Sequence, residues 1–197
     1  MTNDFPEASR HRQGGQEMTF QDLFSLGMKR YPPGLLTCSG PSFDVGSSGK
    51  YQVPGATALG RPDWMHLRDA IPAADDSVAP IHAYHFLEHL TGQDAVSFMR
   101  EVERVLIPER GVFNFSMPYF NTPLMAHNLD HKSLWCEETF RRLFHDDTYE
   151  NFVKWRLRVH FLLIAGIVQR NLCIIGQVIK SDKPAAEFPK WYHPATV

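Results

Sequence analysis

The chain has 197 residues, of which 43% are hydrophobic and 21% are charged, and its formal net charge is -2. This length suits one domain with a sizeable core. The near-neutral charge lacks the basic footprint that nucleic-acid binding requires, so we expect no nucleic-acid partner. The three cysteines are few and widely spaced, which argues against a disulfide framework or a zinc knuckle and favours a reducing compartment. Because the longest unbroken apolar run, Phe161 to Val168, is too short to cross a bilayer, we expect a cytoplasmic protein without membrane association.

Three regions are predicted along the chain. Residues 1–17 are polar and include Gly14-Gly15, as in a flexible tail, and residues 181–197 form a proline-rich, loose C-terminal tail. Between them, residues 18–180 form one domain with neither an internal repeat nor a linker. This domain begins with a short amphipathic helix over residues 18–30, which ends at the turn Tyr31-Pro32-Pro33-Gly34.

Strands and helices then alternate. A short strand over residues 42–45 enters the small-residue turn Gly46-Ser47-Ser48-Gly49, and the next apolar stretch, 56–59, follows too closely for a full crossover helix. After a loop, a strand over 81–84, a helix over 93–106 and a strand over 112–116 follow one another, which favours a parallel β–α–β unit. The sequence therefore predicts an open α/β sheet with its ligand site at the carboxyl ends of the strands.

The C-terminal part changes its periodicity. After a helix over residues 137–144, every second residue from Trp155 to Phe161 is apolar, which is typical of a strand with one solvent-facing side. Residues 171–180 form a second β-rich run. We expect these two runs to pair as an antiparallel hairpin at the edge of the sheet.

Polar side chains gather where the strand 81–84 ends, in the run His85-Phe86-Leu87-Glu88-His89-Leu90. The spacing matches the H-x-x-E-H pattern of a zinc protease family, in which both histidines share one helix face and a third ligand follows. Here His85 comes directly off a strand, and no later helix offers a third ligand, so we predict no metal site. The apolar residues of the run are expected to pack, while Glu88 and His89 cap or orient the turn.

Further motifs surround this run. Ile71-Pro72 and Asp75-Asp76-Ser77-Val78 precede it, Glu103-Arg104-Val105-Leu106 closes the following helix, and Pro108 and Gly111 lead into the next strand. In this order the motifs resemble those of the class I S-adenosylmethionine-dependent methyltransferases, specifically the small type related to the methyltransferase-11 group. The resemblance covers about residues 42–144 and is specific between 71 and 117. It implies a Rossmann-like, mostly parallel α/β sheet that ends in an antiparallel hairpin, with S-adenosylmethionine as the methyl donor.

The resemblance also implies the site residues by position. The expected cofactor-binding residues are Asp44, Gly46, Ser47 and Gly49 around the methionine part, Asp69 and Ile71 near the adenine, and Tyr84, His85 and Phe86 beside the transferred methyl group. Tyr119 and Asn121 are expected on the substrate side. His85 and His131 are the candidate catalytic bases, because histidine titrates near neutral pH.

Departures from the family pattern leave a second hypothesis open. Ser48 replaces the usual middle glycine of the first turn, and Gly60 stands where an acidic residue normally holds the ribose hydroxyls, a role that Asp63 could take. The alternative is a catalytically inactive methyltransferase-like fold that serves as a binding or assembly module. The methyl acceptor stays open among small molecules, glycans and proteins. The apolar side chains of the hairpin fit either a homo-oligomer interface or ordinary core packing, and they are Trp155, Phe161, Leu162, Leu163 and Ile164.

Overall fold

The structure is a computed structural model that describes residues 12–13, 16–17, 36, 38–47, 52–60, 69–145, 155–165 and 172–183. The chain divides into two compact units, residues 1–35 and residues 36–197. In the first unit, the strands β1 (Arg12–Gln13) and β2 (Gln16–Glu17) pair antiparallel. The predicted helix over 18–30 and most of the predicted C-terminal tail lie outside the described residues, and the predicted domain boundaries stay predictions.

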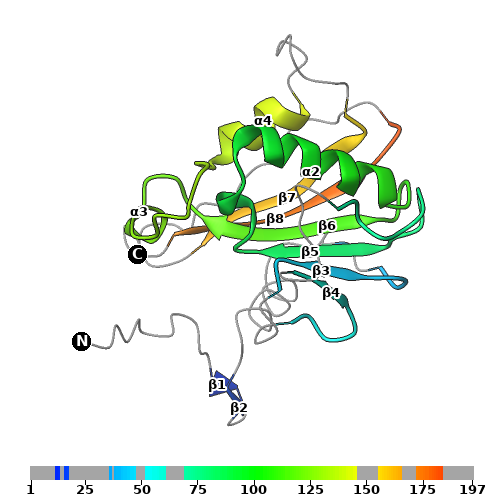
Figure 1. Ribbon diagram of the computed structural model, residues 1–197, viewed down its shortest axis with the longest axis horizontal. Coiled ribbons are helices and arrows are strands. Elements are labelled where there is room, and N and C mark those ends of the chain that lie inside the picture. The colour runs from blue at the N-terminus through cyan, green and yellow to red at the C-terminus, as the bar shows by residue number, and fades with distance from the viewer. Residues whose placement is uncertain are drawn as a thin grey trace. The chain divides into compact units, whose positions relative to one another are not determined.

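A six-stranded sheet forms the centre of the second unit (Figure 1). Its strands are β3 (Phe43–Val45), β4 (Thr57–Leu59), β5 (Pro80–Tyr84), β6 (Val112–Pro118), β7 (Leu157–Ala165) and β8 (Cys173–Lys180). They lie in the order β4-β3-β5-β6-β8-β7. The first four are parallel, while β8 runs antiparallel to both β6 and β7. The predicted mostly parallel α/β sheet with a C-terminal antiparallel hairpin is confirmed, with the addition that β8 separates β7 from the parallel strands.

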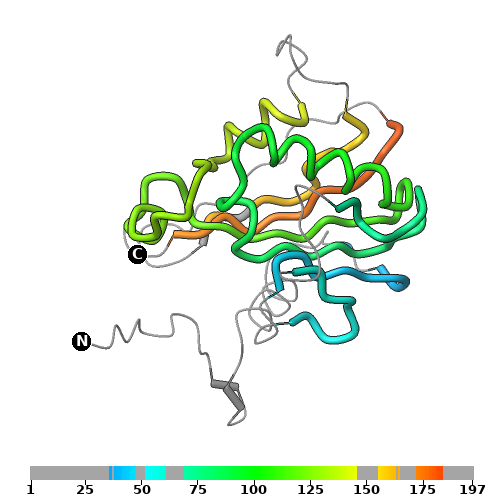
Figure 2. The backbone as a smooth tube through the Cα atoms, viewed as in Figure 1, coloured from blue at the N-terminus to red at the C-terminus, as the bar shows by residue number. Residues whose placement is uncertain are grey.

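Within the described residues, four short or medium helices accompany the sheet: η1 (Leu87–His89), α2 (Gly92–Val105), α3 (Pro123–Ala126) and α4 (Glu137–Phe144). The helix α2 begins at a capping box, in which Thr91 and Asp94 each accept a hydrogen bond from the other's backbone N–H. It carries the chain from the end of β5 back to the start of β6, as Figure 2 traces. None of the helices in the described ranges is long and apolar enough to cross a membrane.

The helices α2 and α4 cover the same face of the sheet (Figure 1). Aromatic side chains connect each helix to β6: Phe98 of α2 lies 5.9 Å from Phe113 between ring centroids, and Phe140 of α4 stacks on Phe115 at 4.8 Å. These pairs contribute beyond their buried area because edge-to-face and offset ring contacts are favourable. The core therefore fixes the crossover helix, and with it the loop between β5 and α2.

The opposite face carries a polar row that crosses four strands. The strand registers place Asp44 opposite His82, His82 opposite Asn114, and Asn114 opposite Gln177. Gln177, which is fully buried, donates to Asn114 Oδ1 at 3.0 Å and exchanges two hydrogen bonds with the backbone of Leu36. Since a buried amide without partners is costly, these mutual contacts make the row compatible with the interior.

Candidate functional site

The turn after β3 is the first part of the predicted cofactor site. Asp44 is 3% exposed, and its carboxylate accepts a hydrogen bond from the Val53 backbone N–H at 2.8 Å. Burial raises the pKa of Asp44, while the hydrogen bonds from Val53 and Ser47 oppose that rise. In this arrangement Asp44 stabilises its own loop. Gly49, together with Ser48, lies outside the described residues.

Gly46 lies against the loop that follows β5. Its φ of 77° belongs to the left-handed region, and its N–H donates to the Leu59 carbonyl at 2.7 Å. A Cβ at this position would lie 2.6 Å from Cδ2 of Phe86. The small residue thus allows the turn after β3 to contact the turn after β5, and the structure brings Gly46 and Phe86 together at the carboxyl edge.

Gly60 follows β4, where the methyltransferase pattern would have an acidic residue. A Cβ here would lie 2.7 Å from the backbone oxygen of Ser47. Real Cβ atoms do not approach a backbone oxygen so closely, so the close contact between the two turns explains the glycine. Asp63 lies outside the described residues.

His85 and Tyr84 differ in their surroundings. The His85 side chain is 41% exposed, and its backbone has a φ of 53° while its N–H donates to the Ser116 carbonyl at 2.8 Å. Such a conformation is uncommon for a residue with a side chain and often marks a functional position. The Tyr84 hydroxyl lies 3.2 Å from Nδ1 of His82, on the face with the polar row. Burial, and secondarily the Asp44 charge, raises the pKa of Tyr84.

The run after β5 forms the helix η1, which places Glu88 in the interior. Leu87 and Leu90 are buried, as predicted; Phe86 is buried too, and Glu88 is 0% exposed. Its Oε1 lies 3.3 Å from Nδ1 of His85, yet neither carboxylate oxygen makes a hydrogen bond within the part of the chain that the structure describes. Burial raises the pKa of Cys173, at the start of β8, to about 12, and the Glu88 charge contributes to that rise.

A loop from a distant part of the chain brings a further histidine, His131, close to Glu88 and His89. The backbone N–H groups of Lys132 and Ser133 donate to the Glu88 carbonyl at 2.7 and 3.2 Å, which places His131 beside η1. The side-chain ligand atoms of Glu88, His89 and His131 all lie within 4.8 Å of one another. The third side chain of the group comes from this loop and not from a later helix, where the H-x-x-E-H pattern would place it.

Ile71 and Asp69 are the two residues that were predicted to lie near the adenine. Ile71 is 1% exposed, and Arg104 of α2 donates to its carbonyl at 3.0 Å. Because α2 runs back from the carboxyl edge, this contact places Ile71 away from His85. Asp69 is half-buried.

On the predicted substrate side, Tyr119 follows β6 and is 9% exposed. Its hydroxyl donates to Glu137 of α4 at 2.8 Å, and burial together with this carboxylate raises the pKa of Tyr119. Asn121 is exposed.

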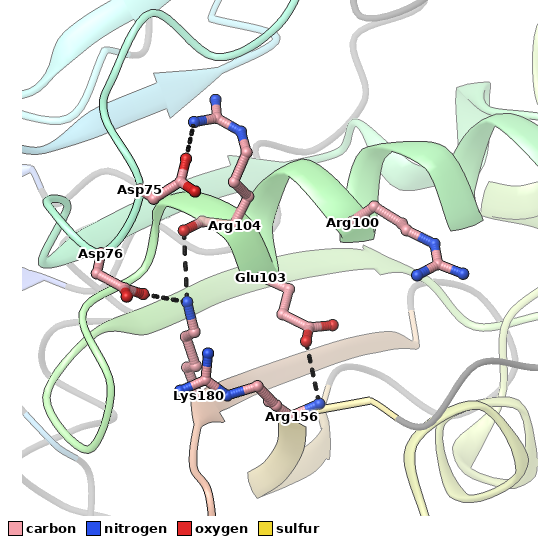
Figure 3. A pocket seen from close by; sticks show the side chains of 7 residues that line it. All are labelled: Asp75, Asp76, Arg100, Glu103, Arg104, Arg156 and Lys180. Atoms are coloured by element: carbon pink, nitrogen blue, oxygen red, sulfur yellow. Dashed lines mark hydrogen bonds and ion pairs between the residues drawn. The ribbon is translucent and has the colours of Figure 1, made fainter.

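A separate pocket of about 250 Å³ lies at the opposite, amino-terminal edge of the sheet (Figure 3). Its lining is charged and consists of Asp75, Asp76, Arg100, Glu103, Arg104, Arg156 and Lys180. These charges pair among themselves and with neighbours: Arg104 bonds to Asp75 at 2.8 Å, and Lys180 bonds to Asp76. These pairings account for the charged lining without a ligand, and the carboxyl edge remains the candidate site.

Comparison with solved structures places this geometry in a known fold. One similar structure is a chain of the complex between the Haloferax volcanii Trm112 methyltransferase activator and a protein named as a methyltransferase (TM-score 0.51, 11% identity, 81% of this chain and 94% of that one). A second is the small RNA methyltransferase HEN1 (TM-score 0.50, 14% identity, 92% of this chain). A third is Haemonchus contortus phosphoethanolamine N-methyltransferase 1, solved with phosphoethanolamine and S-adenosylhomocysteine (TM-score 0.53, 10% identity, 84% of this chain).

The chain spans 28% of the HEN1 chain and 45% of the phosphoethanolamine enzyme. No protein-family model matches the sequence, and no curated protein is significantly similar to it. At identities of 10–14%, structural likeness establishes architecture rather than activity. Sheet order and these likenesses together give the chain a Rossmann-like methyltransferase fold.

Proposed function

We propose that this chain is an S-adenosylmethionine-dependent methyltransferase. The observation that carries the proposal is the contact between the Gly46 turn and Phe86, which joins the ends of β3 and β5 beside the exposed His85. In an open α/β sheet, ligands bind at this edge, where the strand order changes direction. The solved structure that contains S-adenosylhomocysteine supports the choice of cofactor.

The chemistry would be an in-line transfer from the sulfonium to an acceptor, to which the protein contributes mainly proximity and orientation. For a hydroxyl or amine acceptor, we assign the base to His85. Its imidazole reaches solvent at the carboxyl edge, and the buried Glu88 lies 3.3 Å from its Nδ1, so the carboxylate can orient the ring. His131 is the second candidate: its Nδ1 lies 2.9 Å from the Met125 carbonyl, which leaves the Nε2 lone pair available. The acceptor remains open among small molecules, glycans and proteins.

Isothermal titration calorimetry of the full chain with S-adenosylmethionine and S-adenosylhomocysteine tests the proposal. We expect binding of both, at least about tenfold weaker in Gly46→Ala, because a misplacement of about 1 Å near a binding turn has large effects. Gly55→Ala is the matched control: Gly55 also has a positive φ, of 81°, but a Cβ there meets nothing within 4 Å. Absence of heat with either compound at millimolar concentration would exclude an active enzyme.

The second candidate is a catalytically inactive fold that acts as a binding or assembly module. Gly60 favours it, because the contact with the Ser47 backbone leaves no room for an acidic side chain at this position. A protein partner is also consistent with the likeness to a chain of an activator complex. For a homo-oligomer through the hairpin we favour the backbone edge of β7, since Trp155, Phe161, Leu162 and Ile164 are buried in the single chain.

Native mass spectrometry of the purified protein separates the two candidates. A co-purified mass of S-adenosylmethionine or S-adenosylhomocysteine supports the enzyme. A stable oligomer that carries neither compound, combined with the absence of calorimetric binding, supports the module.

A further inference from the structure

We propose that Glu88, His89 and His131 form a binding site for a divalent transition-metal cation, with Zn²⁺ as the expected preferred ion. The three side chains offer one carboxylate and two imidazoles, and their ligand atoms lie within 4.8 Å of one another. Ligands of one Zn²⁺ lie about 2 Å from the ion, so side-chain rotations that bring the three atoms somewhat closer together would let them share one ion. The proposal concerns the metal alone and does not depend on methyl transfer.

The burial of Glu88 is the strongest support. The side chain is 0% exposed, and neither of its oxygens makes a hydrogen bond among the described residues. Burying a carboxylate is unfavourable unless a hydrogen bond, an opposite charge or a metal compensates it. His85 approaches Oε1 at 3.3 Å from an exposed position, which leaves Oε2 without any such partner in the described part of the chain. A cation between Glu88 and the two other histidines would supply it.

The hydrogen bonds of the two histidines give them a tautomer that suits metal binding. Nδ1 of His131 lies 2.9 Å from the Met125 carbonyl, and Nδ1 of His89 lies 3.3 Å from the Asp130 carbonyl. A carbonyl oxygen only accepts hydrogen bonds, so each Nδ1 carries the proton and each Nε2 keeps its lone pair. Backbone carbonyls hold metal-bound histidines in this way in known sites. The rings meet edge to face, with their centroids 4.9 Å apart.

The ligand types indicate the class of ion. Two imidazole nitrogens and one carboxylate oxygen suit Zn²⁺, Co²⁺, Mn²⁺ or Fe²⁺, whereas Ca²⁺ and Mg²⁺ prefer sites made of oxygen atoms. Within the first group, sites of this kind generally bind Zn²⁺ more tightly than Co²⁺ or Mn²⁺. Three protein ligands leave at least one coordination position for water or another molecule, as in open zinc sites.

Hydrogen bonds and a buried tryptophan anchor the loop that carries His131. Besides the two backbone hydrogen bonds to the Glu88 carbonyl, the Ser133 hydroxyl donates to the Leu87 carbonyl at 3.1 Å, and Trp135 donates to the Ser133 hydroxyl at 2.7 Å. Trp135 is itself buried, which anchors the loop in the core. His131 is therefore held beside η1 before any metal arrives, and little ordering remains to be done on binding.

Calorimetry with ZnSO₄ tests the site on the untagged full chain after treatment with a chelator, and CoCl₂ adds a visible absorption spectrum that reports the coordination geometry. We expect one ion per chain, a higher melting temperature with Zn²⁺, and no comparable effect of MgCl₂. His131→Ala should weaken Zn²⁺ binding at least about tenfold. The matched control is His127→Ala, since the His127 ring lies only 6.4 Å from that of His131 but outside the cluster. This variant should bind Zn²⁺ as the original chain does.

Glu88→Gln gives a readout that a merely structural role would not produce. It removes the buried charge but keeps the shape, so the melting temperature without metal should stay equal or rise, while the increase caused by Zn²⁺ should disappear. Two results would overturn the proposal: Zn²⁺ binding weaker than about 1 mM in the original chain, or equal loss of binding in the His127 and His131 variants. If Glu88→Gln does not fold, the two loop variants still decide the question.

Discussion

Replacing Gly46 by alanine should destabilise the protein far more than the same change at Gly55. Both glycines have a left-handed backbone, with φ of 77° and 81°, so each alanine costs about 1–2 kcal/mol from backbone strain. Only at position 46 does the new Cβ meet other atoms, at 2.6, 3.1 and 3.2 Å from the Phe86 side chain. Phe86 cannot retreat easily, because its ring packs edge to face on Phe98 of α2 at 5.1 Å.

Overpacking of this kind costs about 1–3 kcal/mol in well-packed proteins. The expected loss of unfolding free energy is therefore about 2–5 kcal/mol for Gly46→Ala against about 1–2 kcal/mol for Gly55→Ala. Urea unfolding followed by tryptophan fluorescence measures both, and the difference between the two variants isolates the contact with Phe86 from the backbone strain. Adding Phe86→Leu to each variant completes a double-mutant cycle, in which the smaller side chain should recover part of the loss at position 46 only.

Equal losses in the two single variants, within about 0.5 kcal/mol, would refute the reasoning. That result would mean that the Phe86 ring moves away at no cost. The turn after β3 and the turn after β5 would then not be held together by this contact, and the proposed cofactor edge would lose its main support.

Two further predictions concern stability. Burial lowers the pKa of His82 to about 4. Below about pH 6.5 this histidine is therefore protonated in the unfolded chain but stays neutral in the folded protein. Its contribution to stability is complete above pH 6.5 and is lost as the pH falls toward 4. The unfolding free energy should fall by about 2 kcal/mol between pH 8 and pH 5 from this group, and His82→Gln, measured by urea unfolding at both values, should show a correspondingly smaller fall. An unchanged pH dependence in that variant would contradict the assignment. Arg104→Met should cost about 2–3 kcal/mol, because Arg104 bonds to Glu101 and to two backbone carbonyls, whereas Arg142→Met, which removes a half-exposed pair with Glu138, should cost about 0–1 kcal/mol in thermal unfolding. Equal effects of the two arginine changes would show that the charged pocket does not stabilise the fold.

Local patterns predicted most of the sheet and its helices. The helix over 137–144 was predicted with the bounds that the structure has, because Phe140 and Phe144 lie one turn apart on its buried side. The position of β8 between β6 and β7 was not predicted. Part of its signal was present in the sequence, since the apolar residues of β8 stand next to one another, as in strands buried on both faces, whereas β7 begins with a regular alternation.

The cluster around Glu88 could not be predicted in the same way. His131 lies 43 positions beyond Glu88 in the sequence, and the two meet because backbone N–H groups of the loop bond to the Glu88 carbonyl. Hydrogen bonds of the backbone leave no pattern in the residue types, so no spacing rule reports them. Gly60 is a second case that the sequence alone could not explain. The sequence shows that an acidic residue of the family pattern is missing there, but the reason, a close contact with the Ser47 backbone, is visible only in the structure.

The polar row across the sheet has a consequence for how the strands find their partners. Asp44, His82, Asn114 and Gln177 face one another only in the observed register. A shift of one strand by a single residue would turn its polar side chain toward the aromatic layer beneath α2 and place an apolar residue among the amides. Apolar packing alone tolerates many alignments of nearly equal energy, whereas misaligned amides lose their hydrogen bonds in the interior. The row therefore favours the observed strand register during folding. It destabilises registers in which the carboxyl ends of β3 and β5 do not meet.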